Sequence, residues 1–89
     1  MPTINKENSD TTRNRLAWQC RRGMRELDEL LLGFLRQRYP QLGAGDVDSF
    51  TRLLEYPDSV LLEWLTGHMV PSDKDVAHIV REIRHTAVS

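Results

Sequence analysis

The sequence has few of the residues that carry disulfide or metal chemistry. Its 89 residues include a single cysteine, Cys20, and three histidines. One cysteine forms no internal disulfide, which is typical of a reducing compartment, and it excludes a zinc site built from several cysteines. His68, His78 and His85 lack the i, i+4 spacing of a helical ligand pair. We therefore interpret them as surface histidines and expect no metal site.

Long apolar runs and nucleotide or nucleophile motifs are also absent. No stretch of about 18 apolar residues is present, so we expect no membrane span. Residues 1–10 have no apolar segment typical of a secretory signal, and we expect a cytoplasmic protein. There is no glycine-rich phosphate loop and no hydrolase-type nucleophile motif. An acid beside an arginine is too little to specify catalysis, so we do not expect an enzyme.

Charge is nearly balanced overall but unevenly distributed. The formal net charge is −1, which gives no general attraction to nucleic acid or anionic lipid. Residues 11–39 carry seven arginines against three acidic residues, whereas residues 40–89 carry four basic and eight acidic residues. A basic end and an acidic end predict a polarised surface that could orient on an acidic partner.

The apolar pattern predicts an all-α protein. Hydrophobic residues make up 39% and charged residues 28% of the chain, as in a globular domain. Apolar residues recur at helical spacing without strand-like alternation. They predict helices over about 11–22, 24–39, 46–54 and 58–66, and a fifth from residue 72. Short links between them favour a compact five-helix antiparallel bundle over residues 10–89, preceded by a flexible tail over residues 1–9.

Helix ends are predicted from polar residues, glycine and proline. Asp10 and Ser72 are expected N-caps of the first and last helices, with Asp75 three residues after Ser72 as in a capping box. Gly23 is expected to end the first helix in a left-handed conformation, and Pro40 to stop the second.

Residues 18–28 gather three arginines and two acidic residues around Gly23. We expect these charges to face solvent at a helix break, where Gly23 leaves a gap that a partner backbone could approach. The planar guanidinium groups of these arginines can donate hydrogen bonds to carboxylates, phosphates or carbonyls of a partner. The Glu26 carboxylate can accept hydrogen bonds from a partner. The alternative is a solvated turn with weak i, i+4 salt bridges.

For three large or reactive side chains, the sequence pattern predicts whether each one is buried or exposed. Trp18 lies off the main apolar stripe, where we favour packing over the end of the first helix; an exposed anchor for a partner is the alternative. Trp64 lies on a stripe and is assigned to the core. Cys20 also lies on a stripe, so a buried, inert thiol is favoured over a nucleophile.

The stretch Trp18-x-Cys20-Arg21-Arg22-Gly23-Met24-Arg25-Glu26-Leu27-Asp28 resembles the succinate dehydrogenase assembly factor 2 family, the flavinylation factors of bacteria and mitochondria. The hallmark R-G-x-x-E of that family is intact at residues 22–26. The resemblance continues with Phe34, Phe50-x-x-Leu53-Leu54-Glu55, Asp58 and Trp64-Leu65, and covers about residues 13–84. The number and order of the predicted helices agree with the five-helix fold of the family.

The resemblance implies an assembly role. Members of the family bind the flavoprotein subunit of succinate dehydrogenase, and in bacteria that of fumarate reductase, and promote covalent attachment of FAD to it. It implies a monomer that has no cofactor of its own and acts on FAD bound to its partner. It assigns partner binding to Arg22, Gly23 and Glu26, with support from Arg21 and Arg25 and less defined roles for Trp18, Met24 and Asp28.

Two other classes of function remain as alternatives at this level. The clustered arginines also fit a nucleic-acid-binding regulator, although acidic residues interleave with them and aromatic residues are sparse. The resemblance to the family adds an antitoxin-type regulator as a further alternative. A small enzyme would need a sheltered pocket to adjust the pKa of a catalytic group, and the sequence indicates none.

Overall fold

The computed structural model describes residues 2–88, with side chains described for residues 11–87. The α-helices are α1 (Pro2–Gln19), α2 (Arg25–Arg38), α3 (Ala44–Leu53), α4 (Asp58–Leu65) and α5 (Lys74–Val88). A 3₁₀ turn, η1 (Tyr39–Gln41), follows α2 and contains Pro40. Residues 2–88 contain no β-strand. The prediction of an all-α fold with five helices is confirmed.

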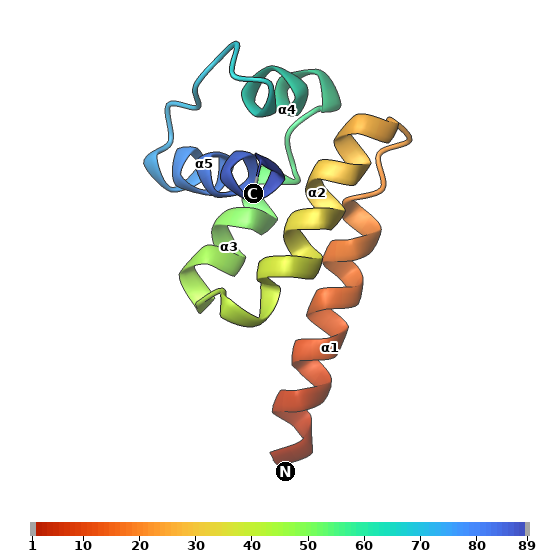
Figure 1. The fold of residues 1–89 in the computed structure, drawn as a ribbon. Coiled ribbons are helices and arrows are strands. Elements are labelled where there is room, and N and C mark those ends of the chain that lie inside the picture. Colours follow the sequence, from red (N-terminus) through yellow and green to blue (C-terminus); the bar gives the residue numbers. More distant parts are fainter. Residues whose placement is uncertain (1, 89) are drawn as a thin grey trace.

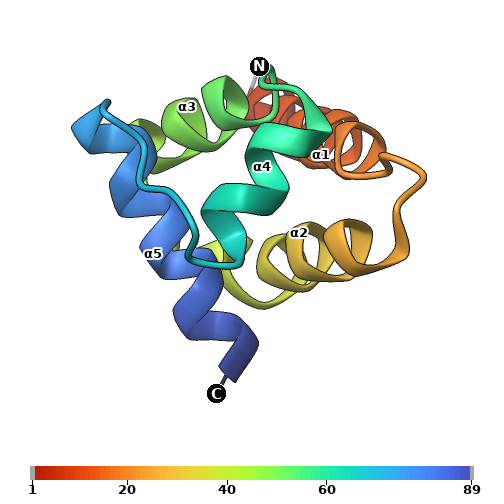
Figure 2. The same cartoon turned by 90° about the horizontal axis from the view of Figure 1, so that it is seen from above.

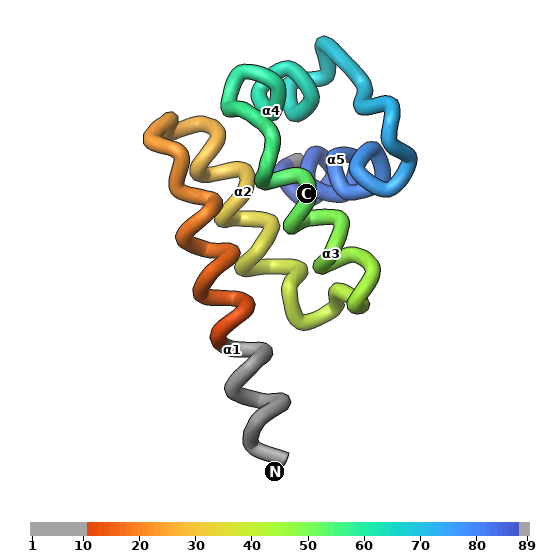
Figure 3. Tube along the Cα trace, turned by 180° about the vertical axis from the view of Figure 1, so that it is seen from behind, coloured from red at the N-terminus to blue at the C-terminus, as the bar shows by residue number. Residues whose placement is uncertain are grey.

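The first two helices form an antiparallel pair to which the other three are added. Figures 1 and 3 show α1 and α2 side by side and running in opposite directions. Helix α5 runs across α2 and α3 and contacts both. Seen from above, α4 lies over the space between α2 and α5 (Figure 2). None of these helices, over residues 2–88, is both long and apolar enough to cross a membrane.

Every helix contributes apolar side chains to one core. Phe34 of α2 and Phe50 of α3 meet near its centre, with ring centroids 5.4 Å apart and planes tilted by 48°. Tilted aromatic pairs of this kind add favourable electrostatics to their buried area. Trp64 lies in the core as predicted, and its ring meets the ring of Tyr56 edge-on. The other buried apolar residues are Leu16, Cys20, Leu27, Leu31, Leu35, Leu53, Leu54, Leu61, Leu65, Val76, Ile79, Val80 and Ile83.

The first helix has different ends from those expected. It ends at Gln19 rather than Arg22, because the Arg22 backbone N–H donates to the Asp28 carboxylate at 2.7 Å instead of to a carbonyl within α1. Its backbone is helical from Pro2. Asp10 therefore lies within α1, and the predicted N-cap at Asp10 is wrong, because an N-cap residue stands just before the first helical residue. The side chains of residues 1–10 lie outside the described part, and the flexible tail over residues 1–9 stays a prediction.

The last helix is capped by Asp73, not by Ser72 as the sequence pattern predicted. Asp73 Oδ1 accepts the backbone N–H groups of Asp75 at 2.8 Å and Val76 at 3.1 Å. Its other oxygen, Oδ2, accepts from the Arg52 guanidinium at 2.9 Å. Asp73 therefore satisfies free N–H groups of α5 and also ties that helix to α3. Ser72 cannot combine these roles because its hydroxyl carries no charge.

The Asp73 cap predicts a pH-dependent contribution to stability. The backbone N–H of Val76, followed by that of Asp75 and by Arg52, lowers the pKa of Asp73 below its ordinary value of 3.8. A lowered pKa means that the ionised carboxylate stabilises the folded state above that value and stops doing so as the pH falls through the folded-state pKa. We expect Asp73→Ala to lower the melting temperature at neutral pH, with a smaller difference from the unmodified protein below pH 3.8.

The matched control is Ser72→Ala, which changes the exposed neighbouring residue and should leave the melting temperature unchanged. Thermal unfolding followed by circular dichroism across this pH range measures both variants. If Asp73→Ala lowered the melting temperature equally at neutral and at acid pH, the charge of Asp73 would contribute nothing to stability.

Candidate partner-docking surface

Residues 20–24 form the sharp loop that joins α1 to α2. Gly23 has a φ angle of +88°, a left-handed conformation that glycine adopts readily because it has no Cβ. No atom lies within 4 Å of the position that a Cβ of Gly23 would take. The expected left-handed glycine is therefore present, and the space beside it is open.

Arg22 holds this loop against the turn between α3 and α4. Its Nε donates to Asp58 Oδ1 at 2.7 Å, and its two terminal nitrogens donate to the carbonyls of Leu54 and Tyr56, each at 2.8 Å. One of these nitrogens also donates to the carbonyl of Gln19 at 3.0 Å, at the end of α1. Because only 16% of its side chain is exposed, the guanidinium acts within the fold.

Asp28 completes the tether from the side of α2. Its carboxylate accepts the Arg22 backbone N–H at 2.7 Å, which fixes the loop to the first turn of the next helix. The expectation that all the clustered charges face solvent is therefore wrong for Arg22 and Asp28. The Asp28 carboxylate accepts the Arg22 backbone N–H, and the Arg22 guanidinium donates to carbonyls at the end of α1 and in the turn between α3 and α4. These two side chains turn inward because such backbone groups need partners.

The remaining charged residues of the cluster face outward. Arg21, Arg25 and Glu26 are exposed, and Arg25 lies 3.9 Å from Glu29 in a loose i, i+4 pair. Glu26 has no ion pair or hydrogen bond with any residue in the described part of the chain. We call Gly23 with the exposed side chains of Arg21, Met24, Arg25 and Glu26 the corner surface. It presents donors, an acceptor and open space on backbone that Arg22 holds in place.

Met24 is partly exposed rather than part of the apolar stripe. It lies just before α2 in an extended conformation, and 36% of it is exposed. The stripe of α2 begins instead at Leu27. The sequence pattern predicted that the helix begins at Met24, one residue before its observed start at Arg25.

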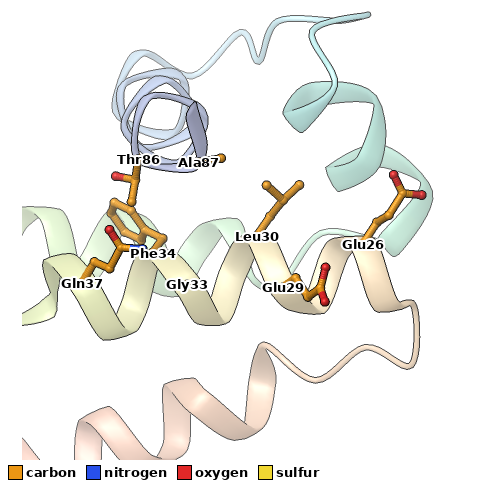
Figure 4. Close-up of a pocket in the computed structure, with 8 residues that line it drawn as sticks. All are labelled: Glu26, Glu29, Leu30, Gly33, Phe34, Gln37, Thr86 and Ala87. Atoms are coloured by element: carbon orange, nitrogen blue, oxygen red, sulfur yellow. The ribbon is translucent and has the colours of Figure 1, made fainter. Parts of the chain in front are cut away.

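Glu26 borders a hollow between α2 and the end of α5. The hollow has a volume of about 380 Å³, and Figure 4 shows Glu26, Glu29 and Leu30 on its α2 side with Thr86 and Ala87 on its α5 side. Gly33 also lines the α2 side and leaves room there, since no atom lies within 4 Å of the position that its Cβ would take. The sequence contained no signal for this hollow, because it depends on where α5 crosses α2.

Trp18 is exposed, so the favoured assignment to packing over the end of α1 is wrong. The residue is 74% exposed and lies on the opposite side of α1 from the buried Leu16 and Cys20. The Arg21 guanidinium carbon is 6.0 Å from the centre of its ring, at the outer limit of a cation–π contact. Exposed tryptophan with a neighbouring arginine is a combination that protein interfaces favour.

The Cys20 thiol is buried, as the sequence pattern predicted. Desolvation raises the pKa of Cys20 to about 12, although the nearby Arg22 guanidinium works in the opposite direction. A thiol with such a high pKa carries almost no thiolate near neutral pH, and the thiolate is the nucleophile. Cys20 therefore contributes to the packing of the hydrophobic core.

Asp58 is the ion-pair partner of Arg22, and it had only an indirect signal in the sequence. It matched the family pattern as a single residue, and no spacing rule connects it with Arg22, which lies 36 positions away. The structure explains the match, since Asp58 begins α4 and neutralises the arginine of the hallmark motif. The carbonyls of Leu54 and Tyr56 could not have been found from residue types, because backbone carbonyls occur at every position.

The histidines lie apart on the surface. His68 contacts Glu63 and Thr66, and His78 lies 3.9 Å from Asp46. Within the described residues, no three His, Cys, Asp or Glu side chains come together as a group that could hold a metal ion.

Comparison with known proteins places this sequence in a family. Residues 14–87 match the model of a family described as the flavinator of succinate dehydrogenase. The FAD assembly factor SdhE of Coxiella burnetii is 36% identical over 77 residues, which cover 86% of this chain and 94% of that protein. The proteins of the same name from a Serratia species and from Yersinia pestis are 41% and 40% identical over 70 residues, or 79% of this chain and 80% of each relative.

The chain belongs to this family. The matched region contains the corner surface, the Arg22 tether and all of the helices except residues 2–13 of α1 and the last residue of α5. The resemblance first seen around residues 18–28 therefore extends over nearly the whole described fold.

The Arg22 tether predicts a large difference between two neighbouring arginines. Replacing Arg22 by alanine leaves Asp58 and the carbonyls of Leu54 and Tyr56 without their donor. We expect the free energy of unfolding to fall by about 2–3 kcal/mol. Arg21→Ala is the matched control and should change stability by less than about 0.5 kcal/mol, as at most exposed positions.

Urea unfolding followed by circular dichroism compares these two variants under identical conditions. Equal stability of Arg22→Ala and Arg21→Ala would contradict the internal role of Arg22.

Proposed function

We propose that this protein binds the flavoprotein subunit of succinate dehydrogenase and promotes the covalent attachment of FAD to it. The observation that carries the proposal is the corner surface. It combines open space at Gly23 with the exposed carboxylate of Glu26, three residues further along the chain, which has no partner among the described residues. Membership of the flavinator family supports the same function.

In this proposal, the flavoprotein brings its backbone close to the protein at Gly23. Glu26 accepts hydrogen bonds from the partner, while Arg21 and Arg25 donate to partner carbonyls or carboxylates. Met24 and Trp18 add apolar contact area at the edge of the polar region. Arg22 and Asp28 act as positioning residues, because their side chains hold the loop that carries Gly23.

The protein acts by selecting a conformation of its client. A partner that binds one conformer more tightly than another raises the population of that conformer in proportion to the difference in affinity. We propose that the favoured conformer brings the bound flavin and its attachment residue into reactive geometry. The protein supplies no catalytic group in this scheme and holds no cofactor of its own.

An assembly factor must also leave its client. A small, polar interface fits that requirement, because charged contacts at the rim of an interface speed association and weaken with salt. The corner surface has this character, since most of its side chains are charged and exposed.

We extend the proposal to the related flavoprotein of fumarate reductase and to a monomeric, cytoplasmic factor, as expected from the sequence. We assign it no nucleic-acid partner. Glu26 and Glu29 lie on exposed turns of α2 beside Arg25, and these carboxylates would repel a phosphate backbone placed on the corner surface.

Glu26→Ala tests the role of the carboxylate. Because Glu26 is exposed and has no partner within the described fold, its removal should leave the melting temperature nearly unchanged. We expect the rate of flavin attachment to fall about tenfold, the effect of losing about 1.4 kcal/mol of binding. Covalent flavin is measured by its fluorescence in the flavoprotein band of a denaturing gel.

Glu63→Ala is the control, since Glu63 is an exposed acid on α4 and should support normal attachment. If FAD were attached at the full rate in the presence of Glu26→Ala, the Glu26 carboxylate would have no role in the proposed mechanism. Loss of the fold in that variant would instead assign Glu26 a structural role.

Gly23→Arg and Gly23→Ala together test the open space. Both side chains must adopt the left-handed backbone at residue 23, which destabilises the fold by about 1–2 kcal/mol. Only arginine also fills the space that the partner is proposed to occupy. We therefore expect similar melting temperatures, partial attachment with Gly23→Ala and almost none with Gly23→Arg. Equal attachment by the two variants would show that the space itself is not used.

A further inference from the structure

A second groove lies between α1 and α2 and shares Arg21 with the corner surface. The less exposed part of its lining is apolar and forms a floor of Ala17, Leu32 and Leu35. The exposed part is polar and forms a rim of Arg13, Asn14, Arg21 and Arg36. We call it the α1–α2 groove. It has a volume of about 250 Å³ and adjoins a shallower hollow of about 410 Å³ beside Trp18. It lies on the side of α2 that faces α1, whereas the hollow beside Glu26 lies between α2 and α5.

The arginines on the rim of the groove differ in their ion pairing from the arginines that stabilise the fold. Arg22, Arg38 and Arg52 each pair with a carboxylate at 2.7–2.9 Å. In contrast, Arg13, Arg21 and Arg36 form no ion pair with any residue in the described part of the chain. The groove therefore concentrates positive charge that no carboxylate among the described side chains neutralises, within the segment where seven arginines face three acids.

The shape and chemistry of the groove favour a polypeptide over a nucleic acid. An apolar floor between two helices suits apolar side chains, and a rim of guanidinium groups suits carboxylates on the same segment. Single-stranded nucleic acid would need aromatic faces on which to stack bases, and Trp18 is the only aromatic residue on the lining of the two hollows. Glu29, on another face of α2, adds repulsion for an extended phosphate backbone.

We infer that the α1–α2 groove docks an acidic segment of the client flavoprotein that also carries apolar side chains. This inference rests on the proposed function and adds a second contact to the corner surface. Apolar side chains of the segment lie on Ala17, Leu32 and Leu35, and its carboxylates pair with Arg13 and Arg36. Trp18 packs against the segment where it leaves the groove toward the corner surface.

The test reverses charge in the groove and leaves Gly23 and Glu26 unchanged. Arg13→Glu/Arg36→Glu is compared with the unmodified protein and with Arg81→Glu, which changes an exposed arginine on α5. Fluorescence anisotropy measures the affinity of each labelled protein for the purified, FAD-loaded flavoprotein subunit of succinate dehydrogenase, at low and at moderate salt. Arg36→Gln is added as a milder variant, and thermal unfolding checks that each one folds.

We expect Arg13→Glu/Arg36→Glu to weaken binding at least about tenfold at low salt and to make the affinity less dependent on salt. Arg36→Gln should weaken binding less, and Arg81→Glu should bind like the unmodified protein. Normal binding by folded Arg13→Glu/Arg36→Glu, with weak binding by Glu26→Ala, would overturn the groove inference and leave the proposed function intact.

Two further outcomes also decide the matter. If the unmodified protein does not bind the flavoprotein, both the groove inference and the proposed function are wrong. A labelled single-stranded DNA serves as a second probe. If the unmodified protein binds this DNA, and the charge reversal abolishes that binding without changing affinity for the flavoprotein, the groove is a nucleic-acid site and the inference fails.

Discussion

The guanidinium of Arg22 ties the loop after α1 to the turn between α3 and α4. It donates to Asp58 and to carbonyls on both sides of this junction. These contacts join segments that are far apart in the sequence, and they hold a bent loop that would otherwise leave backbone groups without partners. The positions of Gly23, of the start of α2 and of the exposed Glu26 all depend on this tether.

The tether separates two kinds of residue within one short motif. Arg22 and Asp28 are used inside the fold, whereas Gly23 and Glu26 face outward beside them. A docking surface gains from this division, because exposed groups held by buried neighbours lose little conformational freedom when a partner binds. A motif can therefore combine residues that contact a partner with residues that only position them.

Helix α2 organises the surface as well as the core. One face carries Leu27, Leu31 and Phe34 into the interior. A second face carries Glu26 and Glu29 beside the end of α5, and a third carries Arg36 toward α1. A helix with apolar, acidic and basic faces provides opposite charges on two sides of the same small domain. Such an arrangement restricts how a charged partner can orient on it.

Local patterns in the amino-acid sequence were enough to predict the helices, most of the core, the buried Cys20 and the left-handed conformation at Gly23. These properties follow from the helical period of apolar side chains and from the absence of a Cβ, and both are local. The exposure of Trp18, the contact of Asp73 with Arg52 and the inward direction of Arg22 depend instead on how the helices pack. The acceptors of Arg22 in the turn after α3 lie 32 to 36 residues away from it. No local pattern specifies which distant carbonyls a guanidinium will meet, because that depends on how the packed helices bring their ends together.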